Sequence, residues 1–332
     1  MQMNSVMAYV ARSVGTFSAE SRVVGVGRSL IALAQISVLV FTPAAYLFVP
    51  VGGEAISIDC RSLPQQASAY CLVDSSQRQL MTWVLLVLLL VVASGLLPRV
   101  TPLVHFWVSL SINSSISLPD GGEVVAQVCT FFLILVCIND RRTWHWQAPR
   151  NDASTSVFQG VAWAGHWGLR LQLFYVYLNS SLAKVSVAPW QEGTATYYVA
   201  RMENFGAAGL FADAVIWSTS LALFALATAW GAILVESTIA ICHLLRGVRQ
   251  IYALVLCVAI HGMIIMQQGI VSFGLVMVGA VVCATSLSTG EVVARAYADM
   301  RAHPRLGQRM ERKQTLAPGP QQPARSSNPL SD

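Results

Sequence analysis

The stretch "LMTWVLLVLLLVVASGLL", Leu80 to Leu97, decides the fold class of this chain. It is an uninterrupted apolar run, long enough at 1.5 Å per residue to cross a hydrocarbon core of about 30 Å. A second run, "LIALAQISVLVFTPAAYLFV" from Leu30 to Val49, has the same character. Of the 332 residues, 55% are hydrophobic and only 11% are charged, whereas soluble domains have about 25% charged residues. The chain is therefore predicted to be an integral membrane protein.

The remaining apolar runs predict an all-α bundle of about eight transmembrane helices. The predicted spans cover residues 27–49, 80–97, 102–117, 122–139, 157–187, 207–245, 250–267 and 270–290, and the long sixth run is expected to kink. Lys and Arg gather in the N-terminus, the alternate loops and the tail, which predicts a multi-pass plasma-membrane protein with both termini in the cytoplasm. We expect a cytoplasmic segment 1–25, a membrane domain 26–295 and a disordered basic cytoplasmic tail 296–332.

The net charge of +5 does not indicate nucleic-acid binding, because the basic residues follow the loops and form no stripe with aromatic residues. Five of the seven cysteines lie in or at the ends of spans, where they are expected to be packing residues. Cys60 and Cys71 lie in the loop between the first two spans, on the predicted outer side, and are expected to form a disulfide rather than to remain free thiols. Neither a CxxC nor an HExxH pattern is present, so no metal site is predicted.

The fifth span contains "HWGLRLQLFYVYLNSSLAK", His166 to Lys184, in which costly polar groups recur at helical spacing. His166, Arg170, Tyr177, Ser181 and Lys184 fall close to one face of a helix. This stripe predicts either a structural polar network between helices or the wall of a binding cavity. Its expected partners are Glu236 on span six, which would pair with Arg170, and His261 on span seven, which is more typical of a packing residue than of a metal ligand.

Lys184 allows two interpretations. A lysine at the outer end of a span can reach up to the membrane interface. Alternatively, an amine held away from water gives up its proton and acts as a base. The turn "SLPDGGE", Ser117 to Glu123, is predicted to lie on the same side, so Asp120 and Glu123 either close a tight hairpin or form an outer pocket with Lys184 and Trp190.

The order of five motifs resembles the HTTM domain, the transmembrane part shared with vitamin K-dependent gamma-carboxylase, over about residues 20–295. The motifs are "GVGRSLIAL", "SLPDGGEVVAQVCTFFLILVCINDRRTWHW", "LNSSLAKVSVAPWQEGTA", "LVESTIAI" and "RQIYALVLCVAIHGMIIMQQGIVSFGLVMV". Within that group the chain is most similar to SdpB-type proteins, sporulation-delaying membrane proteins that help to mature a secreted peptide toxin. The resemblance implies a lysine base for a reduced quinone shortly before a W-x-x-G segment, which matches Lys184 before Trp190 and Gly193.

The carboxylase has a large lumenal region with no counterpart here, so the expected function is maturation of an exported peptide at the outer face, together with a second maturation protein. The alternatives are a quinone-dependent enzyme acting on another substrate and a non-catalytic transporter or immunity protein. The candidate catalytic residues are Lys184, His261 and Glu236. The candidate binding residues are His166, Arg170, Tyr177, Trp190, Asp120 and Glu123.

Overall fold

The structure, a computed structural model, describes residues 2–48, 58, 60–117, 121–150, 157–203 and 205–315. These residues form helices and connecting turns, and none of them lies in a β-strand; a single bridge joins Leu96 to Trp144. The chain divides into two compact units, Met1–Gly290 and Glu291–Asp332. The second unit contains most of the last helix, α15 (Ser286–Thr315).

The first unit is a bundle of long helices joined by short helical turns. The long helices are α1 (Gln2–Gly15), α2 (Arg22–Phe41), α5 (Arg78–Ser94), α6 (Thr101–Ser115), α7 (Gly121–Cys137), α8 (Val157–Val185), α12 (Ala222–Leu244), α13 (Val248–Gln268) and α14 (Val271–Ala284). The shorter helices are α3 (Ala44–Leu47), α4 (Leu63–Gln66), η1 (Ala69–Cys71), η2 (Ser75–Gln77), α9 (Ala188–Gln191), α10 (Ala195–Val199), η3 (Gly209–Phe211) and α11 (Ala212–Thr219).

Four described helical segments are long and apolar enough to cross a membrane: Arg22–Phe41, Ser75–Ser94, Ala222–Leu244 and Val248–Gln268. A bent pair, Val271–Ala284 with Ser286–Met300, would add a fifth. The prediction of a helical membrane protein is thereby confirmed, while the number of eight spans and the cytoplasmic placement of both termini remain predictions. The predicted spans 102–117 and 122–139 correspond to helices of 15 and 17 residues, which are shorter than these segments.

The predicted kink in the sixth apolar run is present. Residues Ser220 and Leu221 separate α11 from α12, and α11 is preceded by the turn η3. The break leaves α9 to α11 as a group of short elements beside α12. The predicted disordered tail 296–332 overlaps α15 as far as Thr315, residues 316–332 lie outside the described part of the chain, and the predicted domain boundaries remain predictions.

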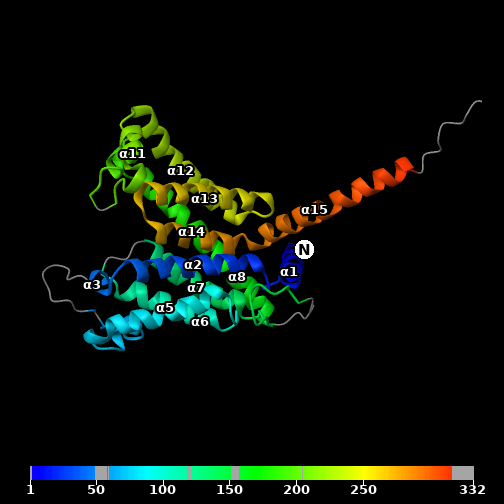
Figure 1. Cartoon of the computed structure of the whole chain (residues 1–332), viewed down its shortest axis with the longest axis horizontal. Coiled ribbons are helices and arrows are strands. Elements are labelled where there is room, and N and C mark those ends of the chain that lie inside the picture. The colour runs from blue at the N-terminus through cyan, green and yellow to red at the C-terminus, as the bar shows by residue number, and fades with distance from the viewer. Residues whose placement is uncertain are drawn as a thin grey trace, which may run out of the picture. The chain divides into compact units, whose positions relative to one another are not determined.

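Close backbone packing holds the centre of the bundle together. Helix α14 lies between α2 and α13 (Figure 1), and its contact with α2 is the most extensive between any two helices. A Cβ atom at Gly27 would lie 2.6 Å from the carbonyl oxygen of Gly279, and a Cβ atom at Gly279 would lie 2.8 Å from that of Gly27. Only glycine fits at either position, which is the small-residue packing that lets membrane helices approach closely.

The described residues form three hydrophobic clusters, and the two larger ones follow from this arrangement. One lies among α2, α7, α8, α12, α13 and α14, and includes Ile31, Leu169 and Ile239. The other lies among α2, α5, α6 and η1, and includes Leu85 and Ile112. Helix α12 packs along α8 beside the first core, and this pair of helices carries Arg170, Lys184 and Glu236.

Candidate functional site

Lys184 lies in the last turn of α8 and forms an ion pair. Its Nζ donates hydrogen bonds to Glu236 Oε1 at 2.8 Å, to Glu236 Oε2 at 2.7 Å and to Ser180 Oγ at 2.7 Å. The side chains of Lys184 and Glu236 are 19% and 12% exposed. The Nζ atom also lies 5.3 Å from the centre of the Trp190 ring, within the range of a cation–π contact. Lys184 therefore turns inward to Glu236 on α12.

The predicted pair between Arg170 and Glu236 is wrong. Arg170 donates from Nε to the carbonyl oxygen of His243 and from Nη2 to that of Leu245, both at 2.8 Å. The reason is the register of two antiparallel helices. Arg170 lies beside the end of α12, and Lys184, fourteen residues or about 21 Å further along α8, lies beside Glu236. Arg170 thus satisfies carbonyl groups that have no partner within α12.

The polar stripe of α8 is buried along its length. His166, Arg170, Tyr177 and Ser181 are each 2% exposed. Tyr177 Oη lies 3.0 Å from His261 Nε2 and donates to Cys257 Sγ at 3.3 Å, so that α8 and α13 are joined by polar contacts. These contacts support the interpretation of the stripe from His166 to Tyr177 as an interhelical polar network. His166, Arg170 and Tyr177 are absent from the cavity wall described next.

A cavity of about 310 Å³ adjoins the Lys184 end of the stripe. Lys184, Glu236, His261 and Trp190 are in its wall, so four of the predicted site residues meet there. The rest of the wall comes mainly from α10 to α14 and the residues that join them. It is mostly apolar, with Val199, Ala200, Val215, Phe224, Ile260, Ile264 and Phe273 among its residues. Hydroxyl and amide groups are also present, from Ser180, Thr196, Thr219, Thr228, Gln267 and Gln268. The cavity therefore presents one ion pair and several hydrogen-bonding groups to an otherwise apolar space.

The predicted acidic turn is only partly described. Asp120 lies outside the described residues. Glu123 is buried, at 5% exposure, in the first turn of α7 and is not among the residues of the cavity wall. Glu123 is thus not in the wall of the cavity that contains Lys184.

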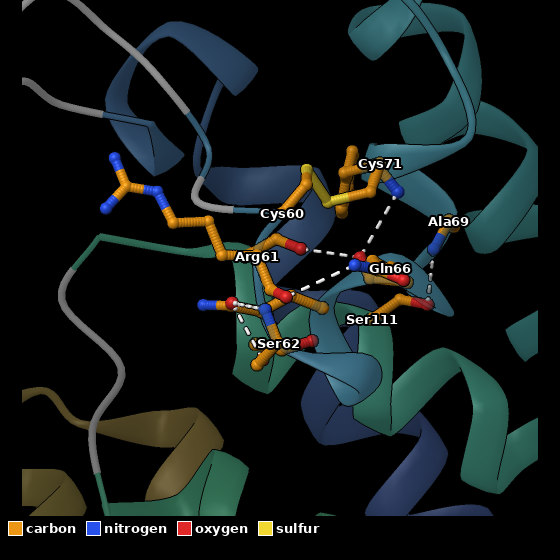
Figure 2. Close-up of a disulfide and its surroundings, with 12 residues drawn as sticks. Cys60, Arg61, Ser62, Gln66, Ala69, Cys71 and Ser111 are labelled. Carbon is orange, nitrogen blue, oxygen red and sulfur yellow. Dashed lines mark hydrogen bonds between the residues drawn. A yellow bond between two sulfur atoms is a disulfide. The ribbon is translucent and has the colours of Figure 1, made fainter.

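The predicted disulfide is confirmed: the sulfur atoms of Cys60 and Cys71 are bonded (Figure 2). The Ala69 backbone N–H donates to Ser111 Oγ at 2.9 Å, which ties this loop to α6. Burial raises the pKa of the neighbouring Tyr70, and the hydrogen bond with Thr82 acts in the opposite direction. The disulfide loop is thus a packed part of the first unit.

A second buried polar cluster was not predicted. Asp140 and Arg142 form an ion pair of 2.6 Å with both side chains fully buried. Arg142 also donates to the carbonyl oxygen of His145 at 2.8 Å, and Arg28 lies 3.2 Å from His145 Nδ1 while donating to Thr101 Oγ1 at 2.7 Å. Burial and the charges of both arginines lower the pKa of His145 to about 3. From the sequence, Arg28 and Arg142 are only two of the basic residues whose distribution predicts the orientation in the membrane.

Ser180 was also missed as a partner of Lys184. The signal was available, because a serine four residues before a lysine lies on the same face of a helix. Within the described residues, no group of three His, Cys, Asp or Glu side chains is arranged to hold a metal ion.

The comparisons with known proteins agree with a helical membrane protein of this type. No family model and no solved structure matches the chain. The chain is 30% identical over 266 residues to the uncharacterized protein YitO of Bacillus subtilis (strain 168), an alignment that covers 79% of this chain and 84% of YitO. It is 28% identical over 293 residues to the sporulation-delaying protein SdpB of the same organism, with 84% of each chain covered. This protein therefore belongs to the family that includes YitO and SdpB, an SdpB-like family of membrane proteins.

Proposed function

We propose that this protein takes part in the maturation of an exported peptide of the toxin type, and that the cavity beside Lys184 is the site where that peptide is modified. Two facts support the proposal: the similarity to SdpB, and the position of a lysine–glutamate pair in the wall of a mostly apolar cavity. The lysine–glutamate pair supports the proposed modification site, because a charged pair at a cavity wall is typical of functional sites inside membranes.

The geometry suggests how the pair works. Glu236 contacts Nζ of Lys184 through both carboxylate oxygens, so it can accept the proton that the ammonium group must lose before the amine acts as a base. His261 reaches the same cavity and is held by Tyr177, which makes it a second proton carrier at the wall. In this proposal the apolar wall binds the peptide's hydrophobic side chains, the predicted outer face of the membrane is where the peptide enters, and a second maturation protein delivers it.

A quinone-linked reaction is the second candidate, in line with the resemblance to the carboxylase. The apolar wall fits a lipid-soluble ring, and Lys184 stands at that wall as the group that would take a proton from the reduced form. Extraction of the purified protein followed by mass spectrometry tests this candidate. A bound quinone would favour it, and repeated preparations without one would argue for a peptide site alone.

The test of the proposed function is the intact mass of the peptide secreted by cells that carry the protein, lack it, or carry variants. We expect mature peptide with the wild type, and unmodified peptide with the deletion, with Lys184→Ala and with the double variant Lys184→Met/Glu236→Leu. The double variant removes the chemistry without leaving an unpaired charge. A normal peptide mass in the deletion strain would remove the whole proposal, whereas a normal mass with Lys184→Ala alone would remove only the role of the lysine.

A further inference from the structure

Near the middle of α8, about 21 Å from Lys184 along the helix axis, two arginines share one aromatic ring. The guanidinium carbon of Arg170 lies 3.9 Å from the centre of the Trp167 ring, and that of Arg246 lies 5.9 Å from the same centre. We propose that Arg170, Arg246 and Trp167 form a binding site for the phosphate headgroup of an anionic phospholipid. The chemistry recognised is a phosphate oxyanion with net negative charge, which the exposed guanidinium group of Arg246 binds through paired N–H donors. The buried Arg170, whose Nε and Nη2 are bonded to backbone carbonyl oxygens, adds positive charge to the site.

Among the described side chains, the two arginines have no negatively charged partner. The ion pairs of the described side chains join Arg142 to Asp140, Lys184 to Glu236 and Arg295 to Glu291, so neither Arg170 nor Arg246 contacts a carboxylate. Like charges this close repel each other, and an anion bound between them would remove the repulsion. The net positive charge of the pair favours an anionic headgroup over a zwitterionic one, whose own cation would remain beside the arginines.

Both side chains are positioned before any ligand binds. Arg170 is 2% exposed and is anchored to the backbone carbonyl oxygens of His243 and Leu245. Arg246 is exposed, but it lies over the Tyr9 ring at 5.1 Å and its Nη2 donates to Ser13 Oγ at 3.4 Å. Three separate parts of the chain, α1, α8 and the turn after α12, therefore converge on this site.

The location indicates a lipid rather than a soluble anion as the source of the phosphate. Arg246 lies in the turn between α12 and α13, two helices that are long and apolar enough to cross a membrane, so it lies where headgroups lie. Helix α1 exposes the apolar residues Met7 and Tyr9, at 69% and 49%, as helices at the interface do. Basic pockets between membrane helices are known sites for anionic headgroups.

The test is a titration of the purified protein in a neutral detergent. Phosphatidylglycerol, phosphatidylcholine with the same acyl chains, and inorganic phosphate are added separately, and the unfolding midpoint is followed. We expect phosphatidylglycerol alone to raise the midpoint of the wild type. Arg246→Gln should need about fivefold more phosphatidylglycerol for the same effect, as for the loss of one basic residue near an anionic surface.

The matched control is Arg249→Gln, which removes another exposed positive charge about one turn further along the chain. It should respond like the wild type. Equal weakening by Arg249→Gln would overturn the proposal in favour of a general charge effect, and an equal response to inorganic phosphate would overturn the assignment to a lipid. Should Arg246→Gln unfold without lipid, Arg246→Lys keeps the charge and is expected to retain phosphatidylglycerol binding, and its failure to bind would count against the site.

Discussion

Removing Glu236 while keeping Lys184 is the most informative perturbation of this structure. In Glu236→Gln, the ammonium group of Lys184 keeps the hydrogen bond to Ser180 but loses both carboxylate contacts. An amide oxygen can still accept one hydrogen bond, but it carries no charge. The positive charge then remains in a largely apolar wall without a counterion.

The expected size of the effect follows from the burial of the pair. Breaking a fully buried ion pair costs about 3–5 kcal/mol, whereas an exposed pair contributes about 0.2–1 kcal/mol. The two side chains are 19% and 12% exposed and border a cavity, so we expect a loss of about 2 kcal/mol for Glu236→Gln and a similar loss for Glu236→Leu. The double variant Lys184→Met/Glu236→Leu leaves no charge and should come within about 1 kcal/mol of the wild type.

The assay uses the protein's own cysteines. Cys129, Cys137, Cys242, Cys257 and Cys283 are free and buried, so a thiol-reactive fluorescent dye reports their exposure on unfolding. A denaturant titration in detergent micelles then gives the free energy of unfolding for the wild type, Lys184→Met, Glu236→Leu and the double variant. The coupling energy of this cycle should be about 2 kcal/mol. Additive effects, with the double variant as unstable as the sum of the single variants, would refute the view that the two charges depend on each other.

Three further predictions concern the rest of the first unit. In Gly25→Ala the new methyl group would overlap the ring of His145, which is fully buried and held by Arg28. The unfolding midpoint should therefore fall by an amount equivalent to about 1–3 kcal/mol. The control variant Gly231→Ala, whose methyl group would meet no neighbour within 4 Å, should not destabilise the protein. Because the pKa of His145 is lowered to about 3, its contribution to stability is complete above pH 6.5 and is lost as the pH falls from 6.5 toward 3. His145→Gln should therefore reduce the slope of stability against pH in that window by about 1.4 kcal/mol per pH unit, and an unchanged slope would show that the imidazole titrates normally. Reduction of the Cys60–Cys71 disulfide, which closes a loop over a sequence separation of 11, should lower the free energy of unfolding by about 3 kcal/mol, and a Cys60→Ser/Cys71→Ser double variant should become insensitive to reductant.

Several features of this protein could be predicted from local patterns. The apolar runs required helices, because every backbone polar group in a bilayer must find its partner within its own segment. The helical period placed His166, Arg170, Tyr177 and Ser181 on one face, and that face is buried. The position of the two loop cysteines predicted their bond, and the excessive length of the sixth run predicted its break.

The tertiary structure alone decided which polar groups meet. The charges of Arg170 and Lys184 make either residue a suitable partner for Glu236, and only the antiparallel register of α8 and α12 selects Lys184. The cavity likewise depends on how α9 to α11 pack beside α12 and α13, and the burial of Arg28 depends on a loop more than a hundred residues away. Periodicity fixes the direction of a side chain around its own helix, but the partner it reaches depends on the axial offset and the packing of other helices, which no local pattern contains.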